Sequence, residues 1–426
     1  MTYEETLDFL YRLEVERMDL KLERVAAALH LCGSPHRRFP TLHIAGTNGK
    51  GSTAAFLHAM LSAAGYRVGL FTSPHLVDFC ERIRLGKRLI TQDEVIDGVA
   101  ALRARIEPAG IHLTPFEMMT LLAFQAFADQ QVDIAVVEVG LGGRLDATNV
   151  LSPLVSIITS IGLDHQAYLG PTLAHIAREK GGIIKTKIPV VLGTLDTESK
   201  HILCDLAEAH GSPVYSAGQD FFCTDNLTDG FDYTGHAWHL HDLQVGLRGR
   251  FQHRNAAVAI AALETIRSSF AVPESCVRQG LLAVSWPGRV QVVSERPLVV
   301  LDGAHNPQAM AILCSELPAL LQGRRAKVVF GVMRDKDWHS MISELAQVAS
   351  EVIVTRVKQD RAEDPLVLQA ALSPLCPTRI VADARDACRQ LLAETAPDEA
   401  LVLCGSLFLV GEVLPLFAPA CTFLSF

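Results

Sequence analysis

A glycine-rich segment with one lysine and three hydroxyl residues is the clearest candidate for chemistry in this sequence. It reads Gly46-Thr-Asn-Gly-Lys-Gly-Ser-Thr53 and lies between an apolar run at 42–45 and a helical pattern that begins at Ala54. A glycine turn between a strand and a helix directs backbone N–H groups and the helix N-terminus at a phosphate. Lys50 could then reach the β- and γ-phosphates of a nucleotide, and Ser52 or Thr53 could join the phosphate or Mg²⁺ shell.

The spacing differs from that of the usual phosphate-binding loop, G-x-x-x-x-G-K-S/T. Only Thr47 and Asn48 separate Gly46 from the glycine before the lysine, and Gly51 separates Lys50 from Ser52. A glycine turn alone could be no more than a tight connection between a strand and a helix. The lysine and the hydroxyls together favour binding of nucleotide phosphates.

Three further polar residues lie near or just past the ends of other apolar runs. Ser73 ends the run at 67–73, Glu138 lies near the end of 133–140, and His165 follows 154–161. In open α/β sheets, ligands bind at the carboxyl ends of the strands. A hydroxyl and a carboxylate suit Mg²⁺, whereas a histidine is a poorer Mg²⁺ ligand and could instead contact a phosphate. Each residue alone could simply be a helix cap or a loop residue. Together with Lys50, the three residues predict one site for a metal ion and phosphates.

The elements that must position these residues alternate between apolar strands and helical patterns, such as 116–127. This alternation predicts a parallel sheet with helices on both faces. Residues 1–30 have a helical pattern, and residues 190–250 suggest a small antiparallel insertion. A second alternation follows a linker at 285–289, with strands expected at 298–301, 327–330, 351–355, 379–381 and 400–404.

We therefore expect an α/β protein with two domains. The first, residues 1–284, is a P-loop-type parallel-sheet ATPase domain, and the second, residues 289–426, is a smaller Rossmann-like α/β domain. A length of 426 residues agrees with two domains rather than one.

Composition excludes several other classes of protein. The net charge of -9 gives no indication of a nucleic-acid-binding protein. None of the ten cysteines forms a C-x-x-C pair, so we expect reduced thiols rather than disulfides or a zinc site. The N-terminus lacks the pattern of a signal peptide. The apolar stretch 400–426 contains Glu412, Pro415 and Pro419, and we interpret it as a strand and a short helix. These features favour a cytoplasmic location and no membrane association.

A second motif with potential chemistry, Asp302-Gly-Ala-His-Asn-Pro307, follows the first expected strand of the second domain. Asp302 could bind a ribose hydroxyl. Asp-Gly and Asn-Pro pairs are also typical of plain turns, and the residues alone leave both readings open.

Taken together, the motifs resemble those of the folylpolyglutamate synthase/dihydrofolate synthase family, a branch of the Mur-ligase-like amide ligases. The resemblance covers essentially the whole chain. The segments that carry it are 17–24 (RMDLKLER), 43–52 (HIAGTNGKGS), 72–76 (TSPHL), 138–149 (EVGLGGRLDATN), 163–165 (LDH), 179–183 (EKGGI), 286–289 (WPGR), 302–307 (DGAHNP) and 404–412 (CGSLFLVGE).

This resemblance implies an ATP- and Mg²⁺-dependent ligase that converts a substrate carboxylate to an acyl phosphate, which the amine of L-glutamate then attacks. It implies a bifunctional enzyme that makes dihydrofolate from dihydropteroate and extends tetrahydrofolates with glutamate. The family precedent also suggests a monomer. The implied catalytic residues are Lys50, Lys180 and His165, and the implied metal ligands are Ser73, Glu138 and His165.

The remaining implied roles concern the nucleotide and the pterin. ATP contacts match Thr47, Asn48, Gly49, Lys50, Gly51, Ser52, Asn255, Arg289, Asp302 and His305. Pterin contacts match Met18, Asp19, Leu20, Thr114, Phe116, Leu145, Asp146 and Ala147. Lys180 matches a lysine that the family carries as a carbamate, which could hold a second Mg²⁺, although it could also be a plain helix-surface lysine. Phe116 could stack on the pterin or belong to the core.

Three alternatives compete with this interpretation. A folylpolyglutamate synthase without the dihydrofolate activity would share most motifs. A Mur-type ligase for a UDP-sugar peptide would need a uridine-binding domain before the phosphate loop, where only about 40 residues stand. A non-catalytic nucleotide switch would not need a second substrate pocket. Departures from the family pattern at Leu20, Phe251 and Gly181 affect substrate detail rather than reaction type.

Overall fold

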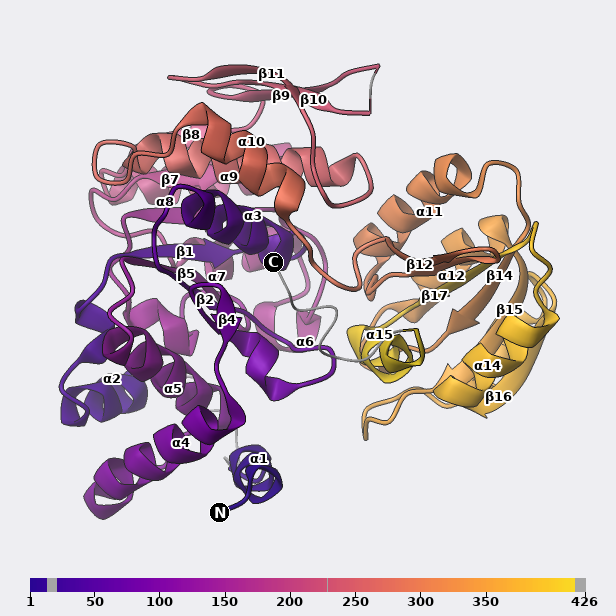
Figure 1. The fold of residues 1–426 in the computed structure, drawn as a ribbon, viewed down its shortest axis with the longest axis horizontal. Helices are drawn as coiled ribbons and strands as arrows, with labels where there is room; N and C mark the ends of the chain where they lie inside the picture. Colours follow the sequence, from indigo (N-terminus) through magenta and orange to yellow (C-terminus); the bar gives the residue numbers. More distant parts are fainter. Residues whose placement is uncertain (14–20, 228, 418–426) are drawn as a thin grey trace.

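The computed structural model describes residues 1–13, 21–227 and 229–417. Figure 1 shows two α/β bodies side by side, joined by the chain between helix α10 and strand β12. The expected division at 284–288 falls in this connection, and we propose it as the domain boundary. In the described ranges, no helix is long and apolar enough to cross a lipid bilayer.

The larger body is built on an eight-stranded sheet with the order β4-β3-β2-β5-β1-β6-β7-β8. The six strands from β2 to β8 in this order run parallel, and β3 and β4 add an antiparallel edge. The bounds are β1 Thr41–Ala45, β2 Val68–Phe71, β3 Ile83–Leu85, β4 Arg88–Leu89, β5 Ile134–Glu138, β6 Val155–Ile158, β7 Val190–Leu192 and β8 Val214–Ser216. The central strands are buried along their whole length, as expected for a sheet covered on both faces.

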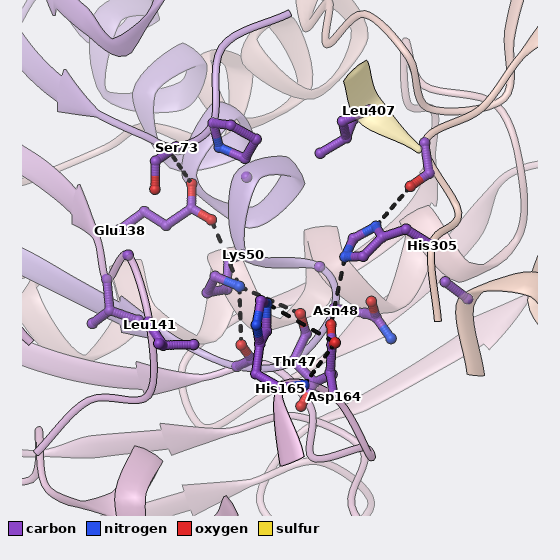
Figure 2. A pocket seen from close by; sticks show the side chains of 18 of the residues that line it. Thr47, Asn48, Lys50, Ser73, Glu138, Leu141, Asp164, His165, His305 and Leu407 are labelled. Atoms are coloured by element: carbon purple, nitrogen blue, oxygen red, sulfur yellow. Dashed lines mark hydrogen bonds and ion pairs between the residues drawn. The ribbon is translucent and has the colours of Figure 1, made fainter. Parts of the chain in front are cut away.

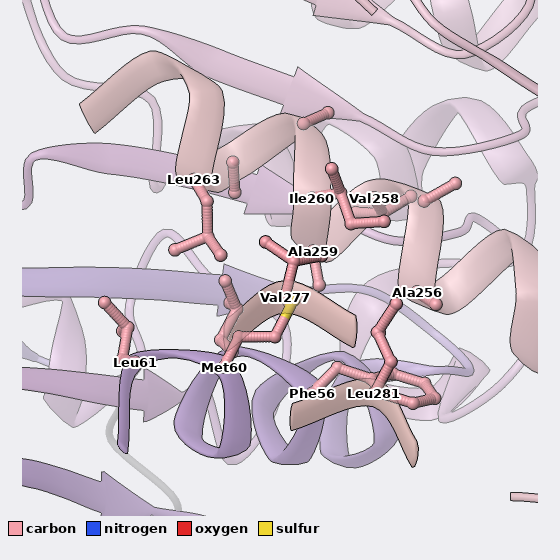
Figure 3. Close-up of a cluster of buried hydrophobic side chains, with 14 of the residues drawn as sticks. Phe56, Met60, Leu61, Ala256, Val258, Ala259, Ile260, Leu263, Val277 and Leu281 are labelled. Carbon is pink, nitrogen blue, oxygen red and sulfur yellow. The ribbon is translucent and has the colours of Figure 1, made fainter. Parts of the chain in front are cut away.

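Helices cover both faces of this sheet. On one face, α3, α9 and α10 form a continuous apolar cluster with the strands, seen in Figure 3. The other face is covered by α1, α2, α4 and α5, and α7 and α8 pack beside β6 and β7. Their bounds are α1 Tyr3–Tyr11, α2 Leu22–Leu31, α3 Lys50–Ala63, α4 Gln92–Ile106, α5 Pro115–Asp129, α6 Gln166–Leu169, α7 Leu173–Gly181, α8 Thr197–Ala209, α9 Phe251–Ile266 and α10 Glu274–Ala283.

The smaller body contains a six-stranded sheet with the order β12-β13-β17-β14-β15-β16, in which only β12 runs antiparallel to its neighbour. Its strands are β12 Gln291–Glu295, β13 Leu298–Leu301, β14 Ala326–Phe330, β15 Ala349–Arg356, β16 Thr378–Asp383 and β17 Ala400–Cys404. Its helices are α11 Pro307–Leu321, α12 Trp338–Val348, α13 Pro365–Leu372, α14 Ala384–Glu394 and α15 Leu407–Val413. The two apolar clusters on its faces confirm the expected α/β class.

The predicted strands are confirmed, but residues 190–250 differ from the expectation, and the antiparallel strands β3, β4 and β12 were not predicted. The expected insertion at 190–250 is wrong in its first part, because β7 and β8 extend the main parallel sheet. Only β9 (Phe222–Asp225), β10 (Phe231–Thr234) and β11 (His239–Leu243) form a separate antiparallel sheet, which lies beside α9 and α10 (Figure 1). The sequence also gave no signal for β12, whose side chains are only partly buried and therefore lack a strong apolar pattern.

Two buried histidines in the larger body allow a prediction about the stability of the protein in acid. Burial lowers the pKa of His43 to about 3 and that of His58 to about 4, so both rings are neutral in the folded chain. The unfolded chain binds these protons below pH 6.5, and the free energy of unfolding must therefore fall as the pH drops below that value. Each ring contributes at most about 1.4 kcal/mol per pH unit. Urea unfolding at pH 7.5 and 5.5 should show a smaller difference in His58→Leu than in the wild type. Equal differences in the two proteins would contradict the assignment.

Candidate active site

A cavity of about 830 Å³ lies between the two bodies, at the carboxyl ends of their parallel strands. The loops that line it follow β1, β2, β5 and β6 in the larger body and β13 and β14 in the smaller one. The predicted site residues that the structure describes line this cavity, with the exception of Thr53, which is fully buried and does not reach it. Met18, Asp19 and Leu20 lie outside the described residues.

The glycine loop needs glycine at two positions, because a side chain at either one would clash with a neighbouring residue. Gly49 has φ +84°, and a Cβ there would lie 2.5 Å from Asn255 Oδ1. A Cβ on Gly46 would overlap the hydroxyl of Thr159. Helix α3 begins at Lys50 without a side-chain cap, so its first N–H groups are available to an anion in the cavity.

Lys50 and Glu138 lie opposite each other beside this loop (Figure 2). Lys50 Nζ donates to the carbonyl of Gly46 at 3.0 Å and lies 3.8 Å from Glu138 Oε1. Glu138 Oε2 accepts from the backbone N–H of Ser73 at 3.4 Å. Burial raises the pKa of Glu138, and Lys50 opposes this effect. A buried carboxylate with two such long contacts is suited to bind an additional cation.

His165 and the neighbouring Asp164 hold an ammonium group from the other body. Lys336 Nζ lies 2.5 Å from Asp164 Oδ1 and donates to His165 Nε2 at 3.2 Å. Burial lowers the pKa of His165 to about 4, so the ring is neutral and can act as an acceptor or a metal ligand. Burial alone would raise the pKa of Asp164. His305, Lys336 and His165 outweigh this effect and lower the pKa below its usual value, so the carboxylate is ionised.

Lys180 is buried at the end of α7, where its Nζ donates to the carbonyl of Gly46 at 2.9 Å. Burial, with a smaller contribution from Lys50, lowers the pKa of Lys180 to about 7. A large fraction of this amine is therefore unprotonated at neutral pH. The alternative interpretation of Lys180 as a lysine on the helix surface is wrong, because its side chain is buried.

The second body contributes a set of residues from the 302–308 segment to the same cavity. Asp302 is buried and accepts from the backbone N–H groups of Val290 and Ala304. Burial lowers the pKa of Arg289, while Asp302 and Glu138 raise it. Asn306 exchanges side-chain hydrogen bonds with Asn48 of the glycine loop, at 3.2 and 3.0 Å. The two bodies therefore meet directly at the phosphate loop.

The predicted pterin contacts Thr114, Phe116 and residues 145–147 also line the cavity, and this part of its lining is the Phe116 wall. Thr114 caps α5 together with Glu117, and Phe116 stacks on Phe71 with ring centroids 5.8 Å apart. Phe116 also packs on Gly140, where a Cβ would lie 2.5 Å from its ring. Leu145 and Ala147 flank Asp146 in the loop after β5.

Sequence reasoning missed the roles of Lys336 and Asp164. Asp164 stands beside the predicted His165, but no role was assigned to it. Lys336 follows β14 by six positions in the charged segment Arg334-Asp-Lys-Asp337. Polar residues after an apolar strand are the signal that could have indicated it, as they did for His165.

Comparison with known proteins agrees with this architecture. Residues 44–263 match the Mur ligase middle domain, and residues 288–407 match the Mur ligase, glutamate ligase domain. A relative from Bacillus subtilis (strain 168), named dihydrofolate synthase/folylpolyglutamate synthase, is 34% identical over 92% of this chain and 94% of its own length. A relative of the same name from Escherichia coli (strain K12) is also 34% identical, over 96% of this chain and 94% of its own length.

Solved structures give the same result. The E. coli protein FolC in complex with DHPP and ADP superposes with a TM-score of 0.91 at 32% identity, covering 98% of this chain and 97% of that one. A bifunctional folylpolyglutamate synthase/dihydrofolate synthase with Mn, AMPPNP and L-glutamate bound superposes with a TM-score of 0.89 at 34% identity, covering 98% of each chain. This chain belongs to the dihydrofolate synthase/folylpolyglutamate synthase family of Mur ligases.

Proposed function

We propose that this chain is an ATP-dependent ligase that adds L-glutamate to dihydropteroate, forming dihydrofolate, and to reduced folates, extending their glutamate chains. One observation carries the proposal. The phosphate loop, the buried Glu138 and the Phe116 wall border one cavity, and residues of the second α/β body complete its lining. Such a cavity can hold a nucleotide and a large planar acceptor together, which a nucleotide switch would not require.

The residues around the cavity have distinct roles in this proposal. Lys50 and the N-terminus of α3 bind and neutralise the phosphates of ATP. The acceptor carboxylate attacks the γ-phosphorus, ADP leaves, and an acyl phosphate forms. The amine of glutamate then attacks the acyl carbon, and inorganic phosphate leaves as the amide forms. Closure of the second body, with Arg289 and His305, excludes water that would hydrolyse the acyl phosphate.

The donor set fits divalent metal ions. Ser73, Glu138 and His165 offer a hydroxyl, a carboxylate and a neutral imidazole in the lining of the same cavity. We propose that they hold one Mg²⁺ and that Lys180, as a carbamate, helps to hold a second. The low pKa of Lys180 fits this modification, because only an unprotonated amine reacts with carbon dioxide. When bound, the metal would neutralise phosphate charge.

The proposed partners are small molecules only: ATP, L-glutamate, dihydropteroate and tetrahydrofolates. We expect the protein to act as a monomer in the cytoplasm, without nucleic acid or membrane partners. Nucleotide contacts are proposed for residues 47–52, Asn255, Arg289, Asp302 and His305. Thr114, Phe116 and residues 145–147 are proposed to contact the pterin.

The experiment that tests this function measures ADP release by the purified protein with ATP, Mg²⁺ and L-glutamate. Dihydropteroate and tetrahydrofolate are compared as acceptors. Glutamate-dependent turnover of both acceptors is the expected result. Turnover of tetrahydrofolate alone would restrict the activity to polyglutamylation, and turnover of neither would point to another amino-acid ligase of the Mur type.

A further inference from the structure

A chain of three buried polar side chains connects strand β1 to the Phe116 wall. His43 on β1 and Thr148 are fully enclosed, and Asp146 is 4% exposed. His43 Nε2 lies 2.8 Å from Thr148 Oγ1, and Thr148 Oγ1 lies 2.5 Å from Asp146 Oδ1. The chain therefore connects the centre of the main sheet to the edge of the cavity, which only Asp146 of the three lines.

The direction of each hydrogen bond follows from the other partners of Asp146. Its Oδ1 accepts from the N–H of Thr148, and its Oδ2 accepts from the N–H groups of Gly140 and Leu141. Burial raises the pKa of Asp146, but the hydrogen bonds from Thr148, Leu141 and Gly140 oppose this effect by stabilising the carboxylate. With the carboxylate as the acceptor, the Thr148 hydroxyl donates its proton to Oδ1. Thr148 Oγ1 must then accept from His43, which fixes the ring as the Nε2–H tautomer. Burial lowers the pKa of His43, in agreement with a neutral ring.

Asp146 uses all of its acceptor capacity on the chain itself. Two bonds per oxygen correspond to the four lone-pair positions of a carboxylate. The bonds to Gly140 and Leu141, 2.8 and 2.9 Å long, hold the turn that starts two residues after Glu138. Phe116 packs on Gly140 in the same turn. The orientation of Asp146 thus sets the shape of the turn that follows the proposed metal ligand Glu138 and supports the proposed pterin contact Phe116.

A purely structural role does not account well for His43. Its Nδ1 is buried and has no hydrogen-bond partner among the described residues. An unpartnered buried nitrogen costs stability. An apolar side chain between β5 and β6, the neighbours of β1, would avoid that cost. The one feature that the imidazole provides is the N–H aimed at Thr148.

We propose that His43 is a positioning residue for the acceptor pocket, and that it acts through the Thr148 hydroxyl on the carboxylate of Asp146. It touches no substrate itself. The kinetic consequence rests on the proposed function, whereas the ordering of the turn at Gly140 and Leu141 does not. Loss of the His43 N–H should loosen this turn and weaken binding of the acceptor, with little effect on ATP.

The test compares His43→Leu and Thr148→Val with two matched variants. Thr148→Ser keeps the hydroxyl. His58→Leu removes another enclosed histidine of the same body, one that donates to the Gly86 carbonyl at 2.9 Å and does not line the cavity. The measurements are hydrogen exchange at the Gly140 and Leu141 amides, and KM for dihydropteroate and for ATP.

His43→Leu and Thr148→Val are expected to speed exchange at both amides and to raise KM for dihydropteroate about tenfold, the effect of one lost hydrogen bond. KM for ATP should change less than about twofold. Thr148→Ser should behave as the wild type. His58→Leu should lower stability without moving either readout.

The inference is overturned if Thr148→Val leaves the exchange of both amides unchanged, or if His58→Leu changes it equally. Thr148→Val replaces only a hydroxyl by a methyl group, so it decides the question even if His43→Leu does not fold. A wild-type protein that turns over no folate acceptor would refute the proposed function alone. The exchange data would still confirm or refute the role of His43.

Discussion

Glu138→Gln is expected to lower kcat/KM by about 10³-fold, an effect typical of removing one electrostatic stabiliser from an active site. The side chain keeps its shape but loses the charge that faces Lys50 and the proposed metal. The variant should still fold, because burial raises the pKa of the Glu138 carboxyl group and so already disfavours its charged form in the wild type. Steady-state ADP release with Mg²⁺ varied, alongside urea unfolding, would measure both effects.

Glu264→Gln serves as the matched control for this substitution. Glu264 accepts hydrogen bonds from the Tyr233 hydroxyl and from the backbone N–H groups of Ala237 and Trp238, and it does not line the cavity. We expect the Glu264→Gln variant to lose stability and to keep its activity, which is the reverse of the result expected for Glu138→Gln. Turnover by Glu138→Gln at the wild-type rate would contradict the proposal that Glu138 is a metal ligand.

Lys180→Arg is expected to lower kcat by about 10²-fold or more, because it replaces a potential anionic ligand with a permanent cation beside Lys50. In the wild type, activity should depend on bicarbonate and should rise as the pH increases through about 7, the value to which burial lowers the pKa of Lys180. The sign follows from the reaction, since only the neutral amine forms a carbamate and its fraction grows with pH. Labelling with ¹³C-bicarbonate would reveal the carbamate carbon by NMR.

Lys185→Arg is the control for the modification. Lys185 also has a pKa lowered by burial, but its Nζ donates to the Asn149 carbonyl and it does not line the cavity. This variant should keep both the ¹³C signal and the bicarbonate dependence. Full activity of the wild type in a bicarbonate-free buffer would contradict the role proposed for Lys180.

The sequence by itself determined the features that depend on near neighbours along the chain. The glycine turn before α3 and the strands ending at Glu138 and Ile158 follow from local patterns of apolar, glycine and polar residues. The ordered motifs were sufficient to indicate the family. Because the carboxyl ends of parallel strands meet at one edge, the sequence also indicated that Lys50, Ser73, Glu138 and His165 border one site.

Only the tertiary structure decided which distant side chains interact. His43 and Thr148 are 105 positions apart, and Lys336 and Asp164 are 172 positions apart. It also placed β7 and β8 in the main sheet and buried Lys180 against the phosphate loop. The physical reason is that burial and pairing depend on how the packed elements exclude water. Local composition does not contain that information, so neither the partner of His43 nor the burial of Lys180 can be derived from the neighbouring residues until the sheet and α7 are assembled.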